Sequence, residues 1–175
     1  MHMAFPEAEL IDCELFMRDM QLTREVRLTR KSLVRWLALS LGLISPNETR
    51  TTMLELLDAL LYFQLAEKKD PDIGEIMDYI KQESGDGNEK AVRYHLLQMK
   101  ETGLIERKKG KYFFAVSPLS EKGDMSSTLD YVYKRRYDMA LVKVKEAMRE
   151  LKDSFSRRKQ PDVELVPFLK KKPST

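Results

Sequence analysis

Basic and amide side chains recur at helical spacing in one segment of the chain, residues 88–116, which reads NEKAVRYHLLQMKETGLIERKKGKYFFAV. Val92, Leu96 and Met99 lie four and three residues apart, which is typical of the buried stripe of a helix. The polar side chains that lie largely off this stripe are Asn88, Lys90, Arg93, Tyr94 and Gln98. Arginine binds guanine edges, lysine binds guanine or phosphate, and the two amides bind adenine, so this face predicts contact with double-stranded DNA in the major groove.

A second basic group follows at an expected turn and consists of Arg107, Lys108, Lys109 and Lys111. Phosphate or minor-groove contact is the chemistry expected of such a tip. Residues 88–112 hold seven Lys or Arg against three Asp or Glu, a net charge of +4, whereas residues 45–87 hold four against ten, a net charge of −6. A charge run is most often a solvated face, but basic charge beside a recognition-helix pattern favours nucleic-acid binding.

Catalysis finds little support in the composition. The chain contains two histidines, His2 and His95, and one cysteine, Cys13, which do not suffice for a catalytic triad or a zinc cluster. No phosphate-binding loop or dinucleotide fingerprint occurs either. We therefore expect no enzyme activity, no metal and no cofactor, and we expect His95 to be a partly buried structural residue.

The elements that position the two basic groups follow from local signals. Asn88 is expected to cap a helix that runs to about Thr102, with Gly103 ending it in a left-handed conformation. Strands are expected over residues 104–108 and 111–116, on either side of a turn at Lys109 and Gly110. Two helices should precede them, one from a cap at Ser45 and Pro46 to about residue 68 and one from Asp70 and Pro71 to about residue 83.

Three helices followed by a hairpin with a basic tip is the element order of a winged helix-turn-helix. The stretch AVRYHLLQMKETGLIERKKGKYFF resembles the third helix and wing of bacterial and archaeal winged-helix regulators, including the ArsR-like and PadR-like groups. The positions that match their pattern are Ala91, Val92, Arg93, Tyr94, His95, Leu96, Met99, Gly103, Leu104 and Ile105. The resemblance covers roughly residues 46–117 and implies a DNA-binding transcription regulator, without singling out one family.

Helices are also expected on both sides of this domain. One is predicted over residues 7–20, one over 29–43 with the single tryptophan, Trp36, and a long one from a cap at Ser127 to about residue 158. The long helix carries a heptad-like apolar seam, and with Trp36 it is expected to form a dimer interface. The seam residues are Tyr133, Tyr137, Ala140, Val144, Ala147 and Leu151.

These observations predict a mainly α fold with a small β-hairpin wing, in which a winged helix-turn-helix is flanked by N-terminal helices and a long C-terminal helix. Four regions are expected: an N-terminal helical extension over 1–44, the winged helix-turn-helix over 45–117, a dimerisation helix over 118–158 and a basic flexible tail over 159–175. The apolar window 33–44 is too short to span a membrane and no signal peptide is recognised, so a cytoplasmic protein is expected.

The function expected is that of a homodimeric transcription regulator. The alternative is a winged-helix module for protein assembly, which would tolerate loss of the basic residues. RNA binding is disfavoured, because Tyr112, Phe113 and Phe114 should pack the wing instead of forming a stacking platform. A pocket between the Trp36 helix and the long helix is conceivable, but no residue demands an effector.

Overall fold

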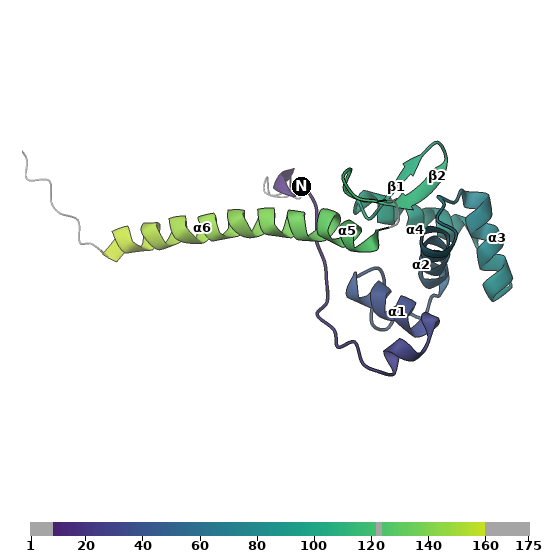
Figure 1. The fold of residues 1–175 in the computed structure, drawn as a ribbon. Helices are drawn as coiled ribbons and strands as arrows, with labels where there is room; N and C mark the ends of the chain where they lie inside the picture. The colour runs from purple at the N-terminus through teal and green to yellow at the C-terminus, as the bar shows by residue number, and fades with distance from the viewer. Residues whose placement is uncertain (1–8, 122–123, 160–175) are drawn as a thin grey trace, which may run out of the picture. The chain divides into compact units, whose positions relative to one another are not determined.

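The computed structural model describes residues 9–121 and 124–159. These fall into two compact units, one ending at Tyr137 and one beginning at Asp138, and we describe each by itself. The chain is mainly helical with one antiparallel hairpin, which confirms the predicted fold class (Figure 1). The elements are η2 (Val26–Leu28), α1 (Arg30–Ser40), α2 (Thr52–Leu61), η3 (Tyr62–Ala66), α3 (Ile73–Ser84), α4 (Glu89–Glu101), β1 (Ile105–Lys108), β2 (Lys111–Phe114), α5 (Met125–Leu129), η4 (Asp130–Lys134) and α6 (Arg135–Lys159).

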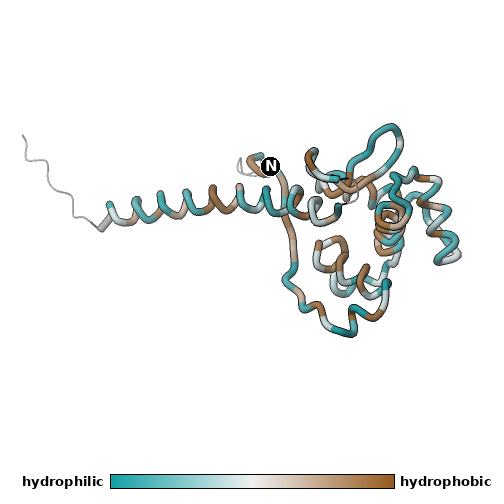
Figure 2. The backbone as a smooth tube through the Cα atoms, viewed as in Figure 1, coloured by the Kyte–Doolittle hydropathy of each residue, from teal (hydrophilic) through white to brown (hydrophobic). Residues whose placement is uncertain are grey.

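The core of the first unit surrounds α2. This helix packs against α1, α3 and α4, and its tube is largely hydrophobic in Figure 2, whereas the turn of the hairpin is hydrophilic. Ten large apolar side chains that are almost fully buried belong to α2, α3, α4 and the start of the hairpin: Leu56, Leu57, Leu60, Ile76, Ile80, Val92, Leu96, Met99, Leu104 and Ile105. The stripe predicted for α4 therefore lies in the core.

Side chains that cap the helices set where α3 and α4 begin. Asp72 Oδ1 accepts the N–H of Glu75 at 3.0 Å, and Glu75 Oε2 accepts the N–H of Asp72 at 2.9 Å, which forms a reciprocal capping box. The expected start at Asp70 and Pro71 is thus two residues too early. Asn88 caps α4 as predicted, because its Oδ1 accepts the N–H of Ala91 at 3.1 Å.

The helix predicted over residues 7–20 is wrong. Of the described residues in that range, only 9 and 10 have helical geometry, and residues 11–20 have no regular structure. Arg18 holds this segment against the end of α1: its N–H donates to the Ser40 carbonyl at 2.8 Å, and its guanidinium donates to the carbonyls of Leu39 and Ile44 at 2.6 and 3.2 Å. The segment satisfies carbonyls that a helix end leaves unpaired, so long-range bonds decide its conformation.

Two other helix starts are also corrected. Ser45 and Glu48 form a turn in which the Glu48 N–H donates to the Ser45 carbonyl at 3.0 Å, and α2 begins seven residues later, at Thr52. The long C-terminal helical stretch starts at Met125, capped by Asp124, whose Oδ1 accepts the N–H groups of Ser126 and Ser127. Ser127 therefore lies inside the first turn.

Two π-helical turns interrupt the helices of this unit. The first, η3, continues α2 to Ala66, and the second, η4, joins α5 to α6. Helix α6 starts in the first unit and supplies all the described structure of the second. The predicted tail lies outside the described residues except for Lys159. Among the described helices, none combines the length and apolar character needed to cross a bilayer.

Candidate nucleic-acid interface

The hairpin that forms the wing is closed by a two-residue turn. Ile105 pairs with Phe114 at its base and Lys108 pairs with Lys111 at its tip. Lys109 and Gly110 both have positive φ, 52° and 81°, as a type I′ turn requires. The predicted turn is thereby confirmed, and it holds the basic side chains of residues 107–109 at the end of the wing.

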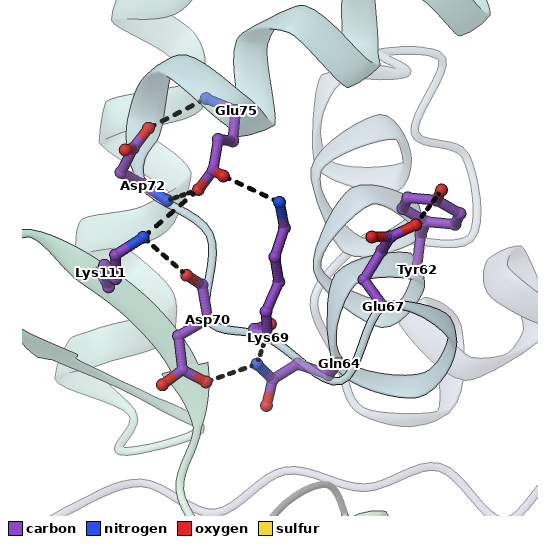
Figure 3. Close-up of polar contacts among 8 residues, drawn as sticks. All are labelled: Tyr62, Gln64, Glu67, Lys69, Asp70, Asp72, Glu75 and Lys111. Carbon is purple, nitrogen blue, oxygen red and sulfur yellow. Dashed lines mark hydrogen bonds and ion pairs between the residues drawn. The ribbon is translucent and has the colours of Figure 1, made fainter.

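The segment before α3 anchors β2 from its other side. The Tyr112 N–H donates to the Pro71 carbonyl at 2.8 Å, and Asp72 and Lys111 form an isolated antiparallel bridge. The Lys111 ammonium lies 3.3 Å from the Asp70 carbonyl and 3.6 Å from Glu75 Oε2 (Figure 3). Lys111, one of the expected DNA contacts, therefore has partners within the domain, although half of its side chain remains exposed.

Glu75 connects this anchor to the end of α2. Its Oε1 lies 2.9 Å from the ammonium of Lys69, whose carbonyl accepts a bond from Gln64 at 2.9 Å (Figure 3). The backbone hydrogen bond from Asp72 lowers the pKa of Glu75 below its ordinary value, and the bond from Lys69 lowers it further. The carboxylate stays charged and links α3, which carries Glu75, to Lys69 after η3 and to Lys111 of β2.

The other three expected contacts at the wing tip, Arg107, Lys108 and Lys109, are also exposed. The guanidinium of Arg107 lies over the Tyr112 ring at 5.5 Å from its centroid. Within the described part of the chain, Lys108 and Lys109 have neither an ion pair nor a side-chain hydrogen bond. These two ammonium groups are available to an anionic ligand.

Helix α4 presents a mixed surface to solvent. Lys90 is exposed without a partner in the described ranges, whereas Arg93 forms an ion pair with Glu89 at 2.6 Å. Gln98 is held within the helix, because its amide donates to the Tyr94 hydroxyl at 3.1 Å and its carbonyl lies 3.0 Å from His95 Nδ1. His95 is partly buried, as expected.

Two exposed apolar side chains lie on the outer face of α4, which the sequence predicts to be polar. Tyr94 is 58% exposed and Leu97 is 50% exposed. The sequence reading omitted Leu97, although its spacing of three from Tyr94 places both on one face. The exposed surface of α4 therefore combines Lys90 with the apolar side chains of Tyr94 and Leu97, and it is not uniformly polar.

The carboxyl end of α4 is fixed by Arg136, a residue that the sequence did not single out. Its guanidinium donates to the Thr102 carbonyl at 3.1 Å and lies beside Gly103, which has φ 76° as predicted. The bond satisfies a carbonyl that the helix leaves free. Arg136 therefore ties the carboxyl end of α4 to the start of α6.

The aromatic residues of the wing pack inward. Tyr112 and Phe114 are buried and Phe113 is half-buried, so they do not form an exposed stacking surface. Clusters of three or more metal-ligating side chains are absent from residues 9–121 and 124–159.

The expected dimer residues occupy different environments. Trp36 is half-buried and donates from Nε1 to the Gln21 carbonyl at 3.0 Å, and Tyr133 packs against the core of the first unit, where burial raises its pKa. The other five are exposed on α6: Tyr137, Ala140, Val144, Ala147 and Leu151. The seam therefore divides into one core residue and an exposed stripe.

One comparison with known proteins finds a match. Residues 63–125 match the model of the ribonuclease R winged-helix domain, a span that includes α3, α4 and both strands of the wing. No curated protein matches, and neither does any solved structure. The match carries no assignment to the ArsR-like or PadR-like regulators; it identifies the domain as a winged helix, a fold consistent with nucleic-acid binding in general.

Proposed function

We propose that this protein is a transcription regulator that binds double-stranded DNA, with α4 in the major groove and the 107–111 wing on phosphate or in the minor groove. The observation that carries the proposal is the pair of unpaired ammonium groups on Lys108 and Lys109 at the wing tip, together with exposed Lys90 on α4. Both elements are those with which a winged helix meets DNA. We propose a binding role without catalysis and a cytoplasmic location.

The proposal includes a homodimer formed through α6. Tyr137, Val144 and Leu151 recur every seven residues, and Met148 and Phe155 widen the same stripe, all with more than half of their surface exposed. A single helix cannot bury such a stripe within itself, whereas a second copy supplies a matching one. Two-fold symmetry then predicts a pseudo-palindromic site with half-sites roughly 34–36 Å apart.

The dimer is tested by a matched pair of substitutions on α6. Val144 lies in the stripe and Val142 lies about 160° away around the helix, yet their exposed fractions are similar, 56% and 61%. Sedimentation equilibrium should detect a dimer for the wild type and for Val142→Glu, and a monomer for Val144→Glu. A monomeric wild type, or equal effects of the two variants, contradicts the interface.

DNA binding is tested with the full chain by fluorescence anisotropy of a labelled DNA duplex at low salt. The double variant Lys90→Ala and Lys108→Ala should lose affinity, because it removes from each DNA-facing element one cation that is unpaired among the described residues. An RNA duplex of the same sequence is the comparison ligand, because the matched domain takes its name from a ribonuclease. Absence of DNA binding, or an unchanged affinity in the double variant, contradicts the proposal.

The second candidate is a winged helix used for protein assembly, and the exposure of Tyr94 and Leu97 on α4 favours it. Apolar side chains on this face suit a protein partner better than base edges, although thymine methyl groups also accept apolar contact. The double variant Tyr94→Ala and Leu97→Ala distinguishes the two functions. DNA binding that depends on the basic pair supports regulation, whereas its absence together with loss of a partner complex in the apolar variant supports assembly.

A further inference from the structure

An apolar cavity of about 510 Å³ lies within the first unit. Helix α1 contributes Leu33 and Leu37, α2 and η3 contribute Leu57 and Leu65, and the wing contributes Leu104 and Phe114. Apart from Arg30, Asp58 and Tyr62, the lining side chains are all Leu, Val, Ala, Met or Phe. Protein cores are close-packed, and binding pockets for small molecules have volumes of roughly 300–1,000 Å³, so this cavity has the size of a ligand site.

The helices around the cavity depart from regular geometry. Tyr62, Leu65 and Ala66 of η3 line it, and Leu129, the last residue before η4, lines it from α5. Single π-helical turns are rare inside helices and occur frequently at functional sites. Leu33 and Leu65 remain 40% and 45% exposed at this cavity, so a bound apolar molecule would cover surface that the fold leaves in water.

The polar residues at the edge restrict the ligand. Arg30 Nε lies 3.2 Å from Asp58 Oδ1, and a terminal nitrogen of the same guanidinium lies 2.8 Å from Glu83 Oε2. The Tyr79 hydroxyl donates to Asp58 Oδ2 at 3.0 Å, and burial with the neighbouring Asp58 raises the pKa of Tyr79 to about 12. The guanidinium of Arg30, the one cation among the lining residues, is thus already paired with two carboxylates, which leaves no unpaired positive charge to attract an anionic ligand.

We propose that this cavity binds a neutral, apolar small molecule. The hydroxyl of Tyr62 donates to Glu67 Oε1 at 2.7 Å, so the edge offers no polar group that lacks a partner. Aliphatic and aromatic lining then selects by shape and hydrophobicity, as is typical of sites for aromatic or hydrocarbon ligands. The occupant is a small molecule and not a second copy, because the cavity reaches inward as far as Leu104 and Phe114, which are almost fully buried.

The same two residues connect the cavity to the wing. Leu104 precedes β1 and Phe114 ends β2, and the Leu104 carbonyl accepts the N–H of Ala115 at 3.0 Å. A ligand in contact with both side chains stabilises one position of the hairpin base. This regulatory consequence rests on the proposed DNA binding, whereas binding of the ligand itself does not.

The binding test uses the full chain and N-phenyl-1-naphthylamine, a neutral dye whose fluorescence rises in apolar surroundings. We expect saturable binding of one dye per chain, unchanged over a wide range of protein concentration, and a thermal midpoint that rises with dye concentration. Leu33→Trp should weaken the affinity by about tenfold or more by filling the cavity. Leu28→Trp, at an exposed leucine outside the lining, should leave it unchanged.

Each opposite result overturns a specific part of the inference. Absence of saturable binding, or equal affinities of the two variants, removes the site. Loss of dye binding as the protein concentration rises assigns the cavity to a second copy, and tighter binding of the anionic 8-anilinonaphthalene-1-sulfonate contradicts the selectivity for neutral ligands. Anisotropy of labelled duplex with and without dye tests the regulatory step: no DNA binding in either case refutes the proposed function alone, and equal DNA affinity refutes only the coupling.

Discussion

Lys108 and Lys111 face each other across the hairpin and differ in the surroundings of their ammonium groups. The Lys108 ammonium has no partner in the described part of the chain, whereas that of Lys111 lies against the Asp70 carbonyl and Glu75. The two residues therefore form a matched pair in which the charge change is the same and the predicted contact with phosphate differs. We expect Lys108→Ala to weaken DNA binding in a salt-dependent manner and Lys111→Ala to leave the salt dependence unchanged.

The size of the expected change in salt dependence follows from counterion release. Each neutralised phosphate contributes about 0.9 to the slope of log K against log salt, so a dimer that loses two contacts should lose about 1.8 from that slope. If binding extrapolated to 1 M salt is unchanged, the affinity of Lys108→Ala at 0.1 M salt should be about 60-fold below that of the wild type. The Lys111→Ala line should run parallel to the wild-type line, with any offset independent of salt.

The assay is anisotropy of a labelled duplex over a series of salt concentrations for the three proteins. Urea unfolding of each variant verifies that the wing remains folded, since Lys111→Ala also removes the contacts of this side chain with Asp70 and Glu75. Equal slopes for the two variants would refute the assignment of phosphate contact from side-chain pairing. A slope near zero for the wild type would refute electrostatic DNA binding altogether.

Three further predictions concern the contacts that hold the interface in place. Asp72→Ala should lower the free energy of unfolding in urea by about 1 kcal/mol by removing the α3 cap, and Asp72→Asn, which keeps an acceptor, should lower it less; no loss in either variant would contradict the capping box. Gly85→Ala and Gly103→Ala both place a side chain at positive φ, but a Cβ at Gly85 meets open space and one at Gly103 lies 3.1 Å from the Arg136 guanidinium. The first should lose about 1–2 kcal/mol from backbone strain and the second should lose more, and equal losses in urea would exclude a role of Arg136 at this turn. The lowered pKa of Glu75 stabilises the fold above its ordinary value of 4.5, and this contribution is lost as the pH falls through the folded-state pKa, so the stability advantage of the wild type over Glu75→Gln should shrink in acid. Thermal unfolding from about pH 7 to about pH 3 measures it, and a difference independent of pH would contradict the role of the charge.

Residues whose conformation is set by their neighbours in sequence were predictable. Asn88 as a helix cap, Gly103 as a left-handed helix end and the Lys109–Gly110 turn each depend on local backbone preferences. These signals define α4 and the wing, which are the two elements of the candidate interface.

Residues governed by distant partners were not predictable in the same way. The pattern of residues 7–20 favours a helix, but Arg18 finds its partners more than twenty residues away at the end of α1. Ser45 and Glu48 have the types and spacing of a capping box, yet the same residues close a turn. The engagement of Lys111 by Glu75 also depends on a contact 36 positions apart in the chain, so sequence spacing alone places it with the free lysines at the tip.

The anchoring of β2 to residues 70–72 means that different residues of the hairpin serve folding and attraction to a polyanion. Strand β2 carries the backbone bond from Tyr112 to Pro71 and the side-chain contacts of Lys111, whereas the side chains of Lys108 and Lys109 take part in neither. Substitutions of Lys108 and Lys109 can therefore change the charge and the length of the side chain without removing a contact that stabilises the domain. The wing tip is a position where the strength of attraction to a polyanion can evolve independently of folding.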